Sequence, residues 1–84
     1  MARKNVGLDL KPNEISTAFD MGDWAKRFPP VLSIPQVSEL LQIPVATIYD
    51  WSSRGLLRGC SRKVGKHLRF WRDRVIHELF NIPE

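Results

Sequence analysis

Residues 33–55 read SIPQVSELLQIPVATIYDWSSRG, and this stretch predicts two short helices joined by a tight turn. Ser33 and Gln36 have the spacing of a capping box, in which two side chains bond backbone groups at a helix start. Pro35 falls in the first turn, where its missing N–H does no harm. The residues predicted to share the buried face of this first helix are Ile34, Val37, Leu40 and Leu41.

The second half of the stretch predicts another helix. Pro44 cannot continue the first helix, which therefore ends near Gln42, but it can begin a helix that runs to about Arg54. Gly55 is the expected end signal, because glycine readily adopts the left-handed conformation that follows many helices. The residues predicted to face inward are Ile48 and Trp51. Two helices of this size with a short turn between them match the helix-turn-helix unit.

Positive charge gathers at the end of this unit and beyond it. Residues 54–74 hold eight Lys or Arg residues and one acid, Asp73, so their net charge is +7. The whole chain has 13 basic and 9 acidic residues, net +4, which leaves −3 for all other positions. Such a concentration favours a polyanion such as double-stranded DNA, because neutralised phosphates release condensed counterions. The alternative is a solvated basic surface that binds nothing.

The sequence after Gly55 predicts a β-hairpin and a closing helix. Two short runs flank Gly65, and in the second run Leu68 and Phe70 share one strand face while Arg69 lies on the other. A hairpin of this size needs a surface to pack on. A helix over residues 72–80 can supply it, and Trp71, just before that helix, is expected to pack in the core or against the wing. The apolar stripe of this helix is Val75, Ile76, Leu79 and Phe80.

These elements together predict the fold class. It is mainly α with a small β-hairpin: a winged helix-turn-helix with a helix-turn-helix, a two-stranded wing and a C-terminal helix. The division expected is an N-terminal arm, partly ordered, over residues 1–31 and a DNA-binding domain over residues 32–84. Two short helices are expected in the arm, one capped by Asn13 and one by Asp23. Some of its larger apolar residues should pack on the domain or on a neighbouring copy; the candidates are Ile15, Phe19, Trp24 and Phe28.

Several function classes are disfavoured by composition. Cys60 is the only cysteine, so the chain can form neither an intramolecular disulfide nor a cysteine-based zinc site, and we expect Cys60 to be a small strand residue. Cys60 and His67 lack a third orienting group, which argues against an enzyme. His67 and His77 make a poor metal site, and no cofactor motif is present. No run approaches the ~20 apolar residues of a membrane span, and no signal-peptide core follows Met1, so a cytoplasmic protein without a membrane partner is expected.

Four pieces of the sequence resemble the MerR-like excisionase family. They are LSIPQVSELL at residues 32–41, TIYDW at 47–51, RGLL at 54–57 and VGKHLRF at 64–70. The resemblance covers residues 32–80. Members of that family are small DNA-binding proteins, either recombination directionality factors or transcription regulators. The resemblance implies that the second helix enters the major groove and that the wing contacts an adjacent minor groove or the backbone.

The resemblance also assigns DNA-binding residues. Thr47 and Tyr49 correspond to hydroxyls near the DNA backbone, although Thr47 can equally pack at the helix start and Tyr49 can be a half-buried ring. Arg54 either binds a phosphate or complements the helix dipole. The wing residues expected to supply most of the affinity are Arg62, Lys63, Lys66, His67 and Arg69.

The second helix departs from the family pattern. Gln42 replaces a frequent glycine, Pro44 replaces a Ser or Thr cap, and Asp50 replaces a basic residue. The face expected to meet the groove is nearly uncharged: Val45, Ala46, Thr47, Asp50 and Ser53. Its small residues can contact a thymine methyl, and Asp50 can accept from a cytosine amino group or pair with Arg54. We therefore expect low sequence selectivity, with DNA shape contributing.

The function expected from the resemblance is that of an excisionase-like recombination directionality factor. It would bind repeated sites, self-associate on the DNA, bend or coat it, and help a tyrosine integrase excise a mobile element. Such a protein would lie with the nucleoid of a bacterium or a phage-infected cell. The alternatives are a transcription regulator with the same fold and a protein interaction or antitoxin-like module whose basic stretch meets an acidic partner.

Overall fold

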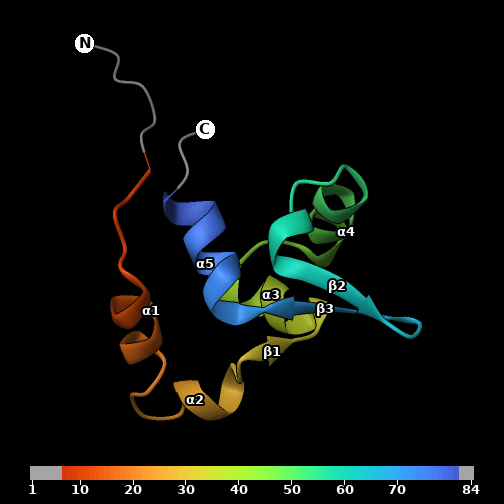
Figure 1. The fold of residues 1–84 in the computed structure, drawn as a ribbon. Coiled ribbons are helices and arrows are strands. Elements are labelled where there is room, and N and C mark those ends of the chain that lie inside the picture. Colours follow the sequence, from red (N-terminus) through yellow and green to blue (C-terminus); the bar gives the residue numbers. More distant parts are fainter. Residues whose placement is uncertain (1–6, 82–84) are drawn as a thin grey trace.

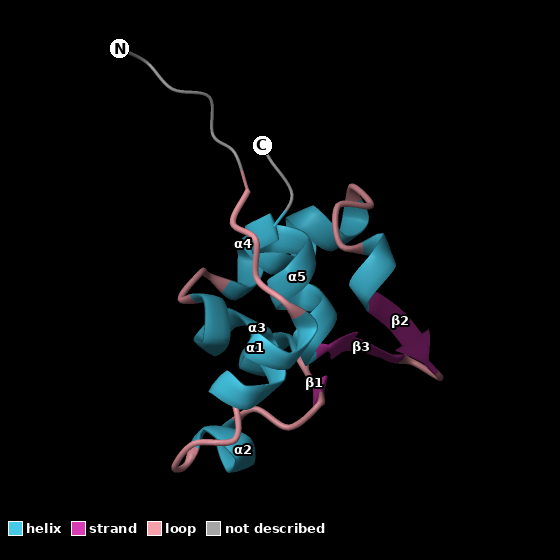
Figure 2. Cartoon of the chain, turned by 60° about the vertical axis from the view of Figure 1, so that its left-hand side comes forward, coloured by secondary structure: helices cyan, strands magenta, loops and turns pink. Residues whose placement is uncertain are grey.

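A computed structural model describes residues 7–81, which form helices around a small antiparallel sheet (Figure 1). The helices are α1 (Pro12–Ala18), α2 (Trp24–Arg27), α3 (Ile34–Leu41), α4 (Val45–Ser53) and α5 (Arg72–Asn81). The strands are β1 (Val31–Leu32), β2 (Ser61–Val64) and β3 (His67–Trp71), and a 3-10 turn, η1 (Arg58–Cys60), precedes β2. Strands β2 and β3 with their turn, residues 61–71, form the wing, which projects from one side of the helical body (Figure 2).

The start of α3 has the predicted capping box. The backbone N–H of Ser33 donates to Gln36 Oε1 at 2.9 Å, and the backbone N–H of Gln36 donates to Ser33 Oγ at 3.4 Å. Leu32 and Val37, on either side of this cap, are both fully buried. Helix α3 then ends where the proline rule predicts, at Gln42. The cap therefore fixes the direction in which the chain enters the helix-turn-helix.

The turn between α3 and α4 requires a left-handed residue. Gln42 supplies it with φ 58°, and within residues 7–81 it is the one non-glycine residue with positive φ. This explains why a glycine suits this position, since a side chain raises the cost of that conformation. Helix α4 ends as predicted at Gly55, whose φ is 78°, and the N–H of Leu56 closes the end by donating to the carbonyl of Trp51 at 3.0 Å.

The sheet has one strand more than the predicted hairpin. Its order is β1-β3-β2, with Leu32 opposite Phe70 and Val31 opposite Trp71. Strand β1 is two residues long, too short for an alternating pattern to be visible in the sequence. It ties the chain before α3 to the wing.

The core combines both halves of the chain. Ile15, Phe19 and Phe28 lie in the same buried cluster as Phe70 and Val75. The expectation that apolar residues of the arm pack on the domain is thus confirmed for three of the four, whereas Trp24 is about half exposed. The other buried members of the cluster are Leu32, Ile34, Val37, Ile48, Leu57 and Cys60.

Helix α1 packs against α5, and a pair of hydrogen bonds joins the chain on either side of this contact. The Asn81 side-chain amide accepts from the backbone N–H of Leu10 and donates to its carbonyl, both at 2.8 Å. The cap of α1 is Lys11 rather than the predicted Asn13, because Pro12 occupies the first helical position. Asp23 occupies the cap position of α2, as predicted, but its side chain makes no capping hydrogen bond.

One cation of the basic stretch is buried. Arg72 donates from Nη1 to the carbonyl of Phe28 at 2.8 Å and from Nε to Asp73 Oδ1 at 2.8 Å. Its guanidinium carbon lies 4.1 Å from the ring centroid of Phe19. The side chain therefore fastens the N-terminal segment to the start of α5 by hydrogen bonds, an ion pair and a cation–π contact.

Three side chains differ from their sequence-based predictions. Phe80 is exposed, since the buried stripe of α5 ends with Leu79. Cys60 belongs to the 3-10 turn rather than to a strand, because Gly59 and the turn before it delay the start of β2. Trp71 is half exposed on the outer side of the sheet, since its neighbour Phe70 takes the inward position. Within residues 7–81, no helix has the length and apolar content that crossing a membrane requires.

Candidate nucleic-acid interface

Helix α4 presents a broad exposed face. Ile48 is fully buried beneath it and fixes its rotation, so that Ala46 and Ser53 point to solvent. As predicted from the sequence, this face is nearly neutral: Arg54 Nη1 lies 3.1 Å from Asp50 Oδ2. The i, i+4 pairing expected as one alternative for Asp50 is therefore present, and it engages the first arginine that the helix offers. An exposed pair of this kind contributes little stability but lowers the local net charge.

A groove of about 520 Å³ separates α4 and the start of α3 from the wing. Tyr49 and Ser53 line it from α4, and Lys63 and Lys66 line it from the wing. The other residues of its wall are Ser33, Ile34, Pro35, Ser52, His67, Leu68 and Arg69. No acid belongs to this wall. The groove thus combines hydroxyl groups with three cations, a donor set that suits phosphate oxygens.

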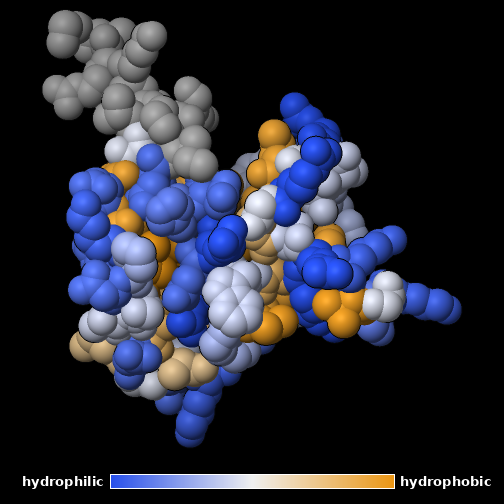
Figure 3. Space-filling model, viewed as in Figure 1, coloured by the Kyte–Doolittle hydropathy of each residue, from blue (hydrophilic) through white to orange (hydrophobic). Residues whose placement is uncertain are grey.

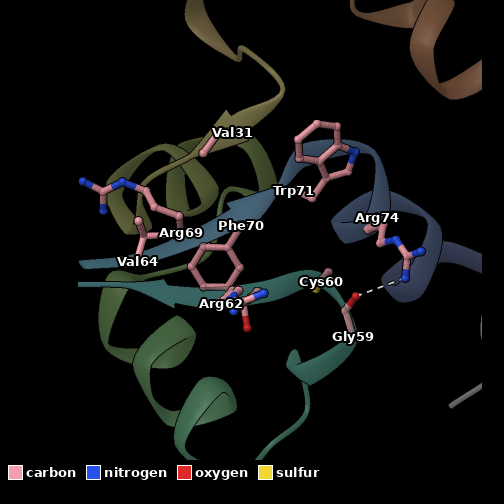
Figure 4. Close-up of a pocket in the computed structure, with 10 residues that line it drawn as sticks. Val31, Gly59, Cys60, Arg62, Val64, Arg69, Phe70, Trp71 and Arg74 are labelled. Carbon is pink, nitrogen blue, oxygen red and sulfur yellow. Dashed lines mark hydrogen bonds between the residues drawn. The ribbon is translucent and has the colours of Figure 1, made fainter. Parts of the chain in front are cut away.

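Strand register divides the basic residues of the wing between two faces. Arg62 lies opposite Arg69, and Lys63 lies opposite Leu68. Because successive strand residues point to opposite faces, Lys63 shares the inner face with Leu68, and Arg62 lies on the outer face. Arg62 lines a second hollow on that outer side, together with Val64 and Trp71 (Figure 4). The predicted wing cluster is therefore not one surface. Arg62 lies away from the groove, whereas Arg69, its partner across the two strands, lines both hollows.

The wing tip holds an exposed cation, Lys66. Gly65 has φ 64° and nothing within 4 Å of the position of a Cβ, so the turn stands clear of the body. Lys66 follows it and is exposed, as is His67. Figure 3 shows hydrophilic groups projecting at this side of the molecule, next to hydrophobic surface over the two wing strands.

Most cations of the basic stretch have no acidic partner within residues 7–81. Of its eight Lys and Arg residues, Arg54 and Arg72 form ion pairs, with Asp50 and Asp73. The remaining six are Arg58, Arg62, Lys63, Lys66, Arg69 and Arg74. Arg69 and Arg74 donate to the backbone carbonyls of Leu68 and Gly59, which leaves their charge unneutralised. The concentration of positive charge predicted from the sequence is therefore retained in the folded chain.

The α4 residues predicted to bind DNA differ in their exposure and in their position relative to the groove. Tyr49 is 58% exposed and lines the groove. Thr47 is partly buried in the first turn of α4, outside the groove wall. Val45 and Ala46 are exposed near the start of α4, beyond the groove wall.

Sequence reasoning missed three polar or turn residues of the groove. Ser33 and Pro35, predicted as helix-start residues, also line the groove at the beginning of α3. Ser52 lies one turn after Tyr49, at i+3, and that spacing is the signal that could have placed it on the same side of α4.

The buried cysteine does not form a catalytic site. The pKa of the Cys60 thiol is raised to about 11, chiefly by burial and also by the carboxylate of Glu78, while Arg74 opposes the shift. The thiol donates to the Leu57 carbonyl at 3.4 Å. Cys60 is therefore protonated at neutral pH and is a poor nucleophile. His67 lies at the opposite end of the hairpin, paired with Val64, so it cannot act as a base for this thiol.

Comparison with known proteins gives one match. A family model described as a helix-turn-helix domain matches residues 31–77, more than half of the chain. The matched range contains β1, α3, α4 and the wing, with the first six residues of α5. No curated protein and no solved structure matches the chain.

Proposed function

The chain belongs to the helix-turn-helix domain family, and on this premise we propose that it is an excisionase-like recombination directionality factor. It is a DNA-binding helix-turn-helix protein. In the proposed role it binds repeated sites beside a recombination site and helps a tyrosine integrase excise a mobile element. The likeness of residues 32–80 to MerR-like excisionases supports this role.

The observation that carries the proposal is the contrast between the nearly neutral face of α4 and the cationic groove beside it. With α4 in the major groove, its exposed residues offer small side chains and one internally paired arginine, Arg54. Bidentate reading of guanine by arginine is then weak. Lys63, Lys66 and Arg69 instead neutralise phosphates, a contact that gives affinity without sequence information.

A protein with these properties suits an architectural role. One module of this size covers only about 600–1,000 Å² of surface on DNA. With little direct base reading, selectivity comes from DNA shape and from several copies bound at neighbouring sites. Copies arranged along a duplex can bend or coat it, which is the contribution that excision by an integrase requires.

Two measurements test the proposal together. Nuclease footprinting across the DNA around the gene should show several adjacent protected sites. In a reaction with the tyrosine integrase encoded nearby, adding the protein should shift products from integration to excision. A single protected site over a promoter, with altered transcript level and unchanged recombination, would instead establish the transcription regulator.

The contribution of the groove has a matched control. Lys66→Ala removes a cation from the groove wall, and Lys26→Ala removes an exposed cation from α2, far from that wall. The Lys66 variant should lose excision stimulation and bind DNA about tenfold more weakly near 0.1 M salt, whereas the Lys26 variant should resemble the unaltered chain. Equal losses in both variants would show that net charge, rather than the groove, determines binding.

A further inference from the structure

The outer face of the sheet carries an apolar patch that no described segment covers. Val31, Val64 and Trp71 come from three different strands, and between about one half and two thirds of each side chain is exposed. They line one hollow of about 340 Å³, shown in Figure 4. Arginines surround them: Arg62, Arg69 and Arg74. We call these six residues the outer sheet patch.

A second exposed apolar surface has the opposite charge. Residues 20–24 read DMGDW, and we call them the acidic loop. Met21 is 67% exposed, and Trp24 is half exposed although it stacks on the buried Phe28 at a centroid distance of 5.4 Å. Asp20 and Asp23 are also exposed. Within residues 7–81 the side chain of neither aspartate forms an ion pair or a hydrogen bond.

The two surfaces complement each other in both polarity and charge. Each presents exposed apolar side chains, an arrangement that marks a contact surface when polar groups surround it. The patch adds three guanidinium groups, and the acidic loop adds two carboxylates, so that bringing them together pairs opposite charges. The loop leads into α2, whereas the wing projects on the other side of the molecule (Figure 1), and none of residues 20–24 lines the hollow of the patch.

We propose that the acidic loop of one copy docks on the outer sheet patch of the next copy, so that copies join head to tail along DNA. This inference rests on the proposed function, which places copies at neighbouring sites. A contact between two different surfaces repeats without closing unless its rotation forms a ring. Lys63 and Lys66 line the groove and not the patch, so docking at the patch leaves these two lysines free for DNA.

The contact involves the six residues of the patch and the five of the loop, against about 20–30 residues on each side of a standard interface, so it is weak in free solution. Interfaces of this size give transient complexes. DNA overcomes this weakness, because two copies on one duplex meet at a high effective concentration. We expect single copies in dilute solution and cooperative binding on a duplex that holds several copies.

The test compares the shortest duplex that binds one copy with a duplex several times longer. Trp71→Ser alters the patch and Met21→Ser alters the loop, and both leave the net charge unchanged. Each variant should bind the short duplex like the unaltered chain and lose about tenfold in cooperativity on the long one, as expected for an aromatic contact residue and its partner. An equal mixture of the two variants should recover part of the cooperativity, because one intact loop and one intact patch remain in each mixed pair.

Charge reversal gives an independent check. Asp23→Arg and Arg74→Glu should each reduce cooperativity, and the chain with both changes should recover it at the original net charge. Recovery in the double variant requires that the two side chains meet between copies.

The results that contradict the inference are distinct from those that contradict the proposed function. Cooperativity retained in both serine variants would overturn the head-to-tail contact, and cooperativity lost only with Trp71→Ser would assign another partner surface to the patch. Weaker binding of Trp71→Ser to the short duplex would make the patch a DNA surface. Failure of the unaltered chain to bind the short duplex even at low salt would overturn DNA binding itself.

Discussion

Arg72 and Lys66 belong to the same basic stretch, but Arg72 is buried in the body and Lys66 is exposed at the wing tip. The guanidinium of Arg72 pairs with Asp73, donates a hydrogen bond to the Phe28 carbonyl and lies over the Phe19 ring. Lys66 has no acidic partner within residues 7–81 and lines the groove. A count of charges treats the two residues alike. Their surroundings differ: the contacts of Arg72 give it a structural role, whereas the charge of Lys66 stays available to a ligand.

The largest effect is expected from the buried member of this pair. Arg72→Ala leaves the Asp73 carboxylate and the Phe28 carbonyl without their partner, so the free energy of unfolding should fall by about 3–5 kcal/mol. Arg74→Ala is the matched control, because it removes an exposed arginine on the same helix and should change stability by less than about 0.5 kcal/mol. Urea unfolding followed by tryptophan fluorescence measures both. Similar stabilities for the two variants would show that Arg72 does not fasten the fold.

The buried thiol gives a second test of the interior. The pKa of Cys60 is raised from 9.0 to about 11 in the folded chain, so folding favours the neutral thiol. This contribution to the free energy of unfolding is complete below about pH 9. It disappears as the pH rises towards 11, which lowers the free energy of unfolding by about 2–3 kcal/mol. Cys60→Ala should remove this part of the alkaline decline, measured as unfolding free energy against pH. Parallel profiles for the two proteins would contradict the raised pKa.

The exposed cations of the wing are tested with two neighbours on opposite faces, Lys63 and Arg62. Lys63→Ala should weaken binding to a duplex that holds one copy about tenfold near 0.1 M salt and reduce the salt slope by about one. Arg62→Ala removes the same charge from the outer face, so its effect on this short duplex should be clearly smaller. Binding titrations at several salt concentrations measure the slopes. Equal slopes would mean that the wing does not present one preferred face to DNA.

The smallest effect is expected at the ion pair on α4. Asp50→Asn releases Arg54 and removes one negative charge from the face proposed to meet DNA, so affinity should rise by a few fold. Stability should change by less than about 0.5 kcal/mol, because the pair is exposed. Fluorescence anisotropy with a short duplex measures the affinity. A loss of affinity would show that Asp50 contacts the DNA, as its alternative assignment to a cytosine amino group requires.

Local signals in the sequence were enough to predict the helix-turn-helix. The capping box at Ser33 and the end signal at Gly55 act through neighbouring backbone groups, so both could be recognised without the fold. The Asp50–Arg54 pair is local for the same reason, since it spans one helical turn.

The features that sequence reasoning missed depend on contacts between distant segments. Strand β1 exists because Leu32 lies opposite Phe70, and no pattern in two residues could indicate that pairing. The separation of Arg62 from the groove follows from the register of β2 against β3, which a charge count ignores. Whether a wing cation faces the DNA is therefore a property of the strand pairing rather than of composition.

The amide of Asn81 holds Leu10 across a separation of 71 positions, with both bonds at 2.8 Å. During synthesis on the ribosome, Leu10 therefore emerges long before its partner exists, and this closure is among the last steps that the nascent chain can complete. Closing so long a loop carries an entropic cost, so we expect the helix-turn-helix to assemble first and the amino-terminal segment to fasten afterwards.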